Sequence, residues 1–244
     1  MDAAILLTLL IFAAGLLYSS VGHGGASGYL AAMALFSLSP DVMKPTALLL
    51  NILVASIATW QFLKTGNFSW KIFWPFAIAS IPFAFLGGTI SLPTYIYKQA
   101  VGLILLFAAI RLFQSEHHEI ITTVKKISIP LAVLFGAVIG FLSGSIGIGG
   151  GIFLSPFLLL IGWAGTRHTA GISAAFILVN SVAGIMGHFA SIRFLPAEIG
   201  YWGIAAVIGG SVGSYLGTKE LATQTLYRLL AIILIIAVLK MLLS

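Results

Sequence analysis

Two glycine-rich clusters that also hold serine and histidine lie 125 positions apart in the chain and could bind an anion. The first reads GLLYSSVGHGGASGYL over residues 15–30, and the second reads GFLSGSIGIGGGIFLS over residues 140–155. Glycine permits positive φ angles and close backbone approach. A helix that begins after such a cluster presents unpaired N–H groups and about half a positive charge. The pattern therefore predicts a site that holds a small anion through the backbone, without lysine or arginine.

The candidate substrate-binding residues fall in these clusters and in the long apolar segment that follows each. They are Ser20, Gly22, His23, Gly24, Gly25, Ser56, Ser145, Gly147, Gly149, Gly150, Gly151, Asn180 and Ser181. A buried amide in lipid needs a hydrogen-bond partner, which favours Asn180 as a site residue. Two other interpretations stay open. The glycines could serve close helix packing, and Ser56 and Ser181 could bond back to their own helices.

The composition indicates that membrane helices position these clusters. Of the 244 residues, 60% are hydrophobic and only 7% are charged, whereas a soluble domain carries roughly 25% charged residues. Apolar segments long enough to cross about 30 Å of hydrocarbon cover residues 3–20, 45–63, 73–90 and 98–113, then 129–145, 169–190, 200–216 and 225–242. We therefore expect an all-α membrane protein, a polytopic helical bundle in a lipid bilayer.

A shorter apolar segment follows each cluster, at residues 26–38 and 152–163. Both are too short to cross upright, and they are typical of half-helices or re-entrant segments. Membranes tolerate such segments only where backbone is buried in protein or lines a wet cavity. Each half thus has about four spans and one short segment. Duplicated halves with glycine-interrupted helices at matching positions indicate a secondary transporter that binds its substrate where the breaks meet.

The polar stretch 114–126 separates a first repeat, residues 1–113, from a second, residues 127–244, and we expect the two to form one membrane domain. If each half crosses the membrane an odd number of times, eight basic residues fall on one face and four on the other. Cytoplasmic loops carry an excess of Lys and Arg. This favours inverted repeats, a cytoplasmic linker and both termini outside. The basic residues lie at segment ends, which argues against a nucleic-acid partner.

The placement of the acidic residues bears on energy coupling. All six carboxylates lie at segment ends or in the linker, and cysteine is absent. We therefore expect no proton relay through Asp or Glu, no metal site and no cofactor. With the cell interior negative, one anionic charge that moves outward releases about 2.3 kcal/mol per 100 mV. Export of an anion then needs no coupled ion.

At GIGGGIFLSP, residues 147–156, the chain resembles the TauE/SafE sulfite exporter family, the transporters of sulfur-containing anions. The family pattern, a G-x-G-G-G run with a proline a few residues later, is met by Gly147, Gly149, Gly150, Gly151 and Pro156. The first cluster departs from it, with alanine at positions 26 and 31. The resemblance covers essentially the whole chain. It implies a carrier in a bacterial or archaeal inner membrane for sulfite, thiosulfate, sulfonates or related small anions.

Two other functions compete with the carrier. The run Gly25-Ala26-Ser27-Gly28 matches the nucleophile motif of intramembrane serine proteases, and His188 would be the base. Against this, Ser27 aligns with Ile152 while the glycines around it are duplicated. An anion channel would use the same backbone site but conduct faster than a carrier. The sequence is compatible with a homo-oligomer.

Overall fold

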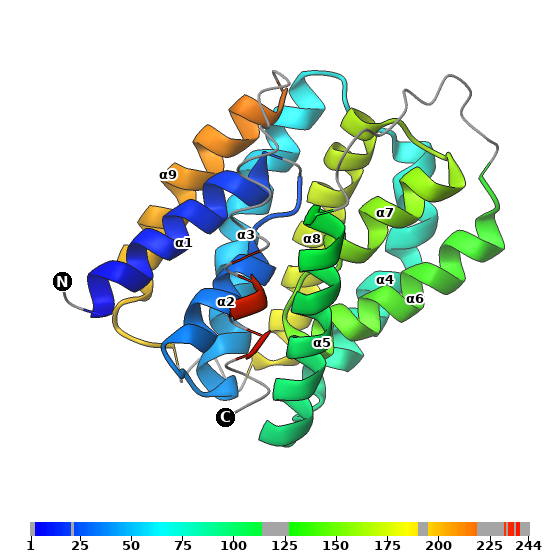
Figure 1. The fold of residues 1–244 in the computed structure, drawn as a ribbon. Coiled ribbons are helices and arrows are strands. Elements are labelled where there is room, and N and C mark those ends of the chain that lie inside the picture. Colours follow the sequence, from blue (N-terminus) through cyan, green and yellow to red (C-terminus); the bar gives the residue numbers. More distant parts are fainter. Residues whose placement is uncertain are drawn as a thin grey trace.

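The computed structural model describes residues 3–20, 22–113, 127–189 and 195–218, together with 232, 234–236 and 238–239. Within these ranges the chain forms helices and no strand. The helices are α1 (Ala3–Ser19), α2 (Ala26–Leu35), α3 (Pro40–Lys64), α4 (Trp70–Thr89), α5 (Thr94–Phe113), α6 (Ile129–Ile146), α7 (Gly151–Ile161), α8 (Thr166–Gly187) and α9 (Ile199–Thr218) (Figure 1). The predicted all-α polytopic fold is therefore confirmed. The last predicted span, 225–242, lies mostly outside the described residues.

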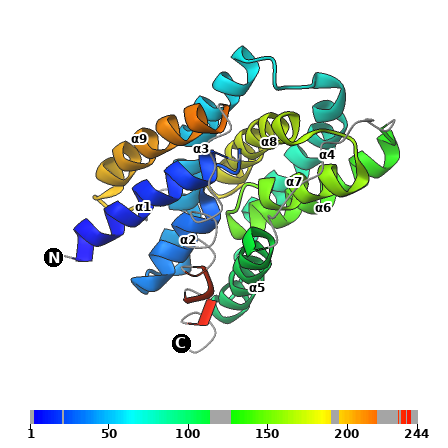
Figure 2. The same cartoon turned by 45° about the horizontal axis from the view of Figure 1, so that its top comes forward.

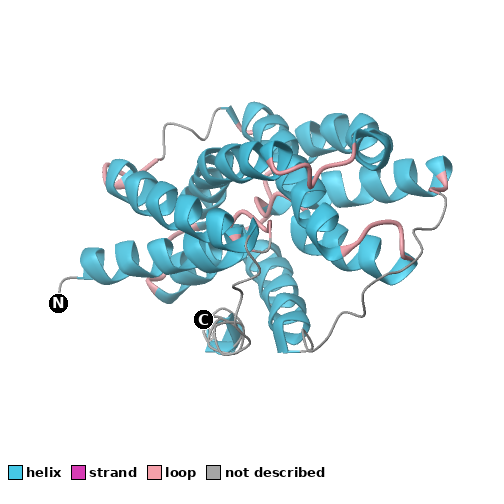
Figure 3. Cartoon of the chain, turned by 90° about the horizontal axis from the view of Figure 1, so that it is seen from above, coloured by secondary structure: helices cyan, strands magenta, loops and turns pink. Residues whose placement is uncertain are grey.

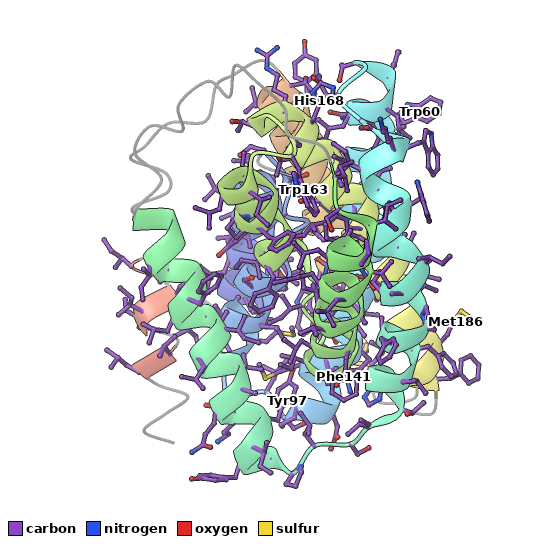
Figure 4. All side chains as sticks on the ribbon, turned by 90° about the vertical axis from the view of Figure 1, so that its right-hand side faces the viewer. Trp60, Tyr97, Phe141, Trp163, His168 and Met186 are labelled. Atoms are coloured by element: carbon purple, nitrogen blue, oxygen red, sulfur yellow. The ribbon has the colours of Figure 1, made fainter. Side chains whose placement is uncertain are left out.

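Apolar helices of membrane-spanning length dominate the structure. By length and composition, α3, α4, α6, α8 and α9 could each cross a membrane, and α1 and the Thr94–Ile110 part of α5 are shorter apolar helices. Trp60 and Met186 project from the outside of the bundle (Figure 4), with 67% and 59% of their surfaces exposed. Trp163 is buried among aromatic rings. The apolar exterior is what contact with lipid requires.

Both predicted short segments are short helices, and each ends before its predicted boundary. In α2 the chain leaves the helix after Leu35, because Ser37 adopts a positive φ of 58°. In α7 the C-cap is Gly162, with φ 75°, and its N–H donates back to Leu158 O at 3.1 Å. Left-handed residues at helix C-termini satisfy the last carbonyl groups in this way. The two helices have 10 and 11 residues.

The helices of the two sequence halves interlock. A shift of 125 residues pairs α1 with α6, α2 with α7, α3 with α8 and α4 with α9. The first helix of each half packs on the fourth helix of the other, α1 on α9 and α6 on α4, while α3 and α8 pack together in the centre (Figure 2). One hydrophobic core unites α1, α2, α3 and α5 with part of α9 and also includes Ile146, Ile148 and Ile152 around the second loop; the second core unites α4, α6, α7 and α8. The packing units therefore differ from the sequence halves.

The long central helices α3 and α8 run in opposite directions. Trp60, near the end of α3, and His168, near the start of α8, lie at the same end of the molecule in Figure 4. Met186, near the end of α8, lies farther toward the opposite end. Helices paired by the 125-residue shift thus oppose each other in direction at this central position.

Glycines within helices α6 and α9, away from the positive-φ turns, bring helices into close contact. In α6, a Cβ atom on Gly136, Gly140 or Gly144 would collide with backbone of α4. In α9, Gly209, Gly213 and Gly217 face the backbone of α1 and of Ser20 in the same way. Small residues four apart permit this approach in membrane helices. The close-packing interpretation therefore holds for these two stripes.

Candidate functional site

The clustered glycines differ from the packing glycines because they turn the chain. Six of them have positive φ, and they match in pairs under the 125-residue shift: Gly22 (74°) with Gly147 (90°), Gly24 (70°) with Gly149 (79°), and Gly25 (115°) with Gly150 (84°). L-residues with a side chain rarely adopt this conformation. The predicted glycine breaks are therefore confirmed, and each requires glycine at three equivalent positions.

Positions 26 and 151, which match under the 125-residue shift, explain why the first cluster has alanine where the second has glycine. Gly151 and Ala26 are both the first residue of a helix, and neither needs a positive φ. A Cβ on Gly151 would crowd Ile177, 2.7 Å from its Cγ1 atom. Gly151 therefore serves packing against α8, whereas alanine is compatible with the helical conformation at position 26.

The two loops meet on Asn51 of α3 and Ile177 of α8. Loop segments, drawn in pink, lie at the centre of the helical bundle in Figure 3. A Cβ placed on Gly24 would lie 3.1 Å from Asn51 Oδ1 and 3.1 Å from Ile177 Cγ2. A Cβ on Gly149 would lie 2.8 Å from Asn51 Nδ2 and 2.8 Å from Ile177 Cγ2. Equivalent glycines of the two halves thus flank the same two side chains.

Two helix N-termini begin at this meeting point without side-chain caps. The N-cap residues of α2 and α7 are Gly25 and Gly150, and neither helix has a side-chain cap hydrogen bond. From the centre, α2 descends and α7 rises in Figure 1. The first N–H groups of each helix are donors that the helix itself cannot satisfy. Two partial positive charges of the helix dipoles are thereby placed within the protein interior.

Asn51 bridges the two loops, although sequence reasoning favoured Asn180. Its fully buried amide donates from Nδ2 to Ile148 O at 3.4 Å and to Ser181 Oγ at 3.5 Å. Its Oδ1 has no hydrogen-bond partner in the described part of the chain. Asn51 aligns with Phe176 under the 125-residue shift, so the repeat gave no signal for it. The argument applied to Asn180, that a buried amide in lipid needs a partner, would have found Asn51 as well.

A chain of polar side chains links the first loop to the second half. His23 Nε2 lies 2.8 Å from Ser155 Oγ on α7, and Ser155 Oγ lies 2.7 Å from Ser173 Oγ on α8. Both serines are buried, and His23 is half-buried. The 125-residue shift places three apolar residues at the corresponding positions, namely Ile148, Leu30 and Leu48. The polar chain therefore has no polar counterpart at the equivalent positions of the other half.

Two buried tyrosines hold the backbone of the loops. Tyr29 donates its hydroxyl proton to Gly24 O at 3.1 Å, and Tyr97 of α5 donates to Ile146 O at 3.1 Å. The Tyr29 ring also fills the space that a side chain at position 25 would occupy, since a Cβ on Gly25 would lie 2.5 Å from its hydroxyl oxygen. The loops are thus fixed by packing and hydrogen bonds.

The structure brings some of the other predicted residues to this region and leaves others outside it. Ser181 accepts the bond from Asn51, and Asn180 is buried with its Nδ2 donating to Phe176 O at 2.8 Å. Ser20 donates to Leu17 O at 2.7 Å. Ser145 Oγ is buried without a described partner and lies beside Gly87 of α4.

The structure does not bring the predicted site residue Ser56 to the loops. Its side chain is exposed, and its Oγ donates to Ile52 O at 2.6 Å. Ser56 therefore bonds back to its own helix, which was the alternative interpretation of this residue. Its counterpart Ser181 is fully buried. The two serines occupy matching positions in the sequence, but only Ser181 faces the loops.

A helical membrane protein with two paired glycine breaks at its centre is organised as membrane transporters are. The chain belongs to the TauE/SafE family: the family model described as Sulfite exporter TauE/SafE matches residues 7–241. A probable membrane transporter protein of Sinorhizobium fredii, y4hK, is 43% identical over 242 residues, which cover 98% of both chains. Another probable membrane transporter protein, of Methanocaldococcus jannaschii, is 31% identical over 75% of this chain and 73% of its own. No solved structure matches the chain.

The protease alternative is wrong, because the family and these relatives are membrane transporters. The local geometry agrees with this assignment. Nδ1 of His188 donates to Gly88 O at 2.8 Å, a bond that ties the end of α8 to α4. Ser27 is buried in the first turn of α2, within the break.

Proposed function

We propose that this transporter exports a small sulfur-containing oxyanion, such as sulfite, thiosulfate or a sulfonate, by alternating access. The anion is held between the N-termini of α2 and α7. The observation that carries the proposal is the convergence of two uncapped helix N-termini, through Gly24 and Gly149, on the same two residues. The name of the family model supports the sulfur chemistry.

The electrostatics of the site favour an anion. Each helix N-terminus supplies about half a positive charge, so two together approximate one. Asp41, in the first turn of α3, is the only carboxylate within the described helices, and it lies at a helix end rather than in the middle. An anion at the centre is therefore attracted by the N–H donors, and the side chain of Lys44 on α3, beside Gly147, adds a positive charge near the second loop.

Export follows from the membrane potential. An anion that leaves a cell with a negative interior gains about 2.3 kcal/mol per charge per 100 mV. We place the protein in a bacterial or archaeal inner membrane, with both termini outside and the linker 114–126 in the cytoplasm. Residues 1–113 and 127–244 are then inverted repeats, which the opposed directions of α3 and α8 support.

The moving parts in this proposal are the two packing units and not the two sequence halves. Each core mixes helices from both halves, and the glycine loops lie where α3 and α8 of the two units meet. A rocking motion of one unit against the other would open the loops first to one side and then to the other. Rigid-body movement around a fixed central site is a common form of alternating access.

Efflux from proteoliposomes tests the function. Vesicles loaded with sulfite should lose it faster when a potassium gradient with valinomycin makes the interior negative, and external sulfite should accelerate the exchange. Gly149→Ala should abolish efflux, while Gly200→Ala, at a position with open space and no positive φ, should not. The absence of sulfite flux in folded protein would overturn the proposal. Non-saturating flux would indicate a channel.

A further inference from the structure

The Asn51 amide presents an unpaired acceptor at the anion site. Its Nδ2 faces two acceptors, the carbonyl oxygen of Ile148 and the hydroxyl of Ser181. The opposite assignment of the amide would set its oxygen against the Ile148 carbonyl oxygen, so hydrogen bonding fixes the orientation. Oδ1 must then point toward Gly24, where it lies 3.1 Å from the position of a Cβ atom. Asn51 is fully buried, and no described residue donates to this oxygen.

A buried acceptor beside a set of N–H donors restricts the ligand. A fully deprotonated oxyanion offers only acceptor oxygens, so it would satisfy the helix N-termini but be repelled by Oδ1. An oxyanion that keeps one proton offers both kinds of group. Its charged oxygens accept from the N–H groups of α2 and α7, and its proton is donated to Asn51 Oδ1.

Building on the proposed export of a sulfur oxyanion, we propose that the transported form is the monoprotonated monoanion, such as hydrogen sulfite, and that Asn51 recognises its proton. The single negative charge matches the two half-charges of the helix N-termini. Dianions lack the proton that Asn51 Oδ1 would accept. Sulfonates carry the correct charge, but none of their oxygens carries a proton to donate.

Few titratable groups surround the site, so the ligand's own titration can be observed. They are His23 on the first loop, Tyr18 on α1, Tyr29 on α2, Lys44 on α3 beside Gly147, Asp41 and His188 near Lys44, and Tyr97 on α5. On α6 and α7 there is no acidic or basic residue, and on α8 only Arg167 and His168 in its first turn. A titration of any of these groups would change the binding of every anion alike.

Calorimetric binding to the purified protein in detergent, under nitrogen to prevent oxidation of sulfite, tests the inference. The ligands are sulfite and methanesulfonate, a monoanion that carries three oxygens on sulfur but has no proton to donate or to lose over this pH range. Sulfite loses its last proton near neutral pH. We expect its apparent affinity to fall by about tenfold per pH unit above that point, while methanesulfonate affinity changes little. At acidic to neutral pH, sulfite should bind about tenfold more tightly than methanesulfonate, as one additional hydrogen bond predicts.

Asn51→Leu, of similar size but without an acceptor, should bring the two affinities to within about twofold of each other. Ser214→Ala, a buried serine of α9 that bonds back to Gly210 O, is the control and should keep the preference for sulfite. If Asn51→Leu does not fold, the pH dependence of the two affinities in the wild-type protein still tests the inference. Parallel pH profiles for both ligands, or an unchanged preference in Asn51→Leu, would overturn the inference and leave the proposed function standing. Failure of both anions to bind would overturn both.

Discussion

His23 Nε2 and Ser155 Oγ lie 2.8 Å apart, and this contact joins the first glycine loop to α7 of the second half. The first loop is therefore held by the second half as well as by Tyr29 of its own half. In the equivalent loop Ile148 takes the position of His23, and Leu30 takes the position of Ser155. The two loops are alike in backbone and different in side-chain chemistry.

The coupling between His23 and Ser155 can be measured by a double-mutant cycle. We expect His23→Ala and Ser155→Ala each to lower the free energy of unfolding, with a coupling energy of about 0.6 kcal/mol and at most roughly 1.7 kcal/mol, the range for hydrogen bonds between membrane helices. Denaturation in mixed detergent micelles gives the values. Ser56→Ala, at an exposed serine bonded to its own helix, is the control. Additive effects of the two changes would show that the contact contributes nothing.

Position 26 in the first cluster should accept glycine. Ala26→Gly reproduces the residue found at position 151, and both positions are helical. We expect transport to be retained, with a stability loss of at most about 1 kcal/mol from the flexibility of glycine. Gly25→Ala, one residue earlier, requires φ 115° and collides with the Tyr29 ring, so it should abolish transport. Equal activity of the two variants would contradict the distinction between turning and helical positions.

Substitution in the glycine stripe of α6 should affect folding and not substrate affinity. Gly140→Ala places a methyl group on the backbone of Ser80 in α4. We expect destabilisation of about 1–3 kcal/mol, as for overpacking, and unchanged anion affinity in the protein that remains folded. Tm and binding of sulfite, measured on the same preparation, separate the two effects. A stable variant that has lost affinity would place this stripe in the binding site.

The end of α8 should make stability depend on pH. Burial lowers the pKa of His188 from 6.5, the positive charge of Lys44 lowers it further, and the bond to Gly88 O and the charge of Asp41 oppose the shift. Because the unfolded chain then binds a proton more readily than the folded one, protonation favours unfolding. The stability should be complete above about pH 6.5 and decrease as the pH falls below it.

His188→Gln tests whether His188 causes this pH dependence of stability, because glutamine can still donate to Gly88 O but does not titrate. Tm measured in detergent between about pH 8 and about pH 5 should decline less for the variant than for the wild-type protein. Identical declines would assign the pH dependence to other groups.

Helix length, composition and the 125-residue repeat predicted the helices and the breaks, because each depends on local sequence. The packing of α1 on α9 and of α4 on α6 could not be predicted, since the sequence of an apolar helix does not specify which other helix it contacts in lipid. The same limit applies to side chains. Serine at position 56 and serine at position 181 match in the sequence, but only the fold decides that the first is exposed and the second is buried.

The repeat gives no signal for polar residues that occur in only one of the two halves. Asn51, Ser155 and Ser173 align with Phe176, Leu30 and Leu48, so a search for duplicated chemistry passes over them. They lie at the site because α3, α7 and α8 bring them to the loops. Where a pseudo-symmetric site binds an asymmetric ligand, we expect such unduplicated polar residues to carry specificity.

If both glycine loops hold one anion, a change in either loop should weaken its binding, and equilibrium binding of sulfite to Gly24→Ala and Gly149→Ala measures this. Each change strains a positive φ and crowds Asn51, from opposite loops. We predict that either substitution alone weakens binding by at least about tenfold, while Gly200→Ala binds as the wild-type protein does. If either loop variant folds and binds sulfite with wild-type affinity, the anion does not lie between the two loops.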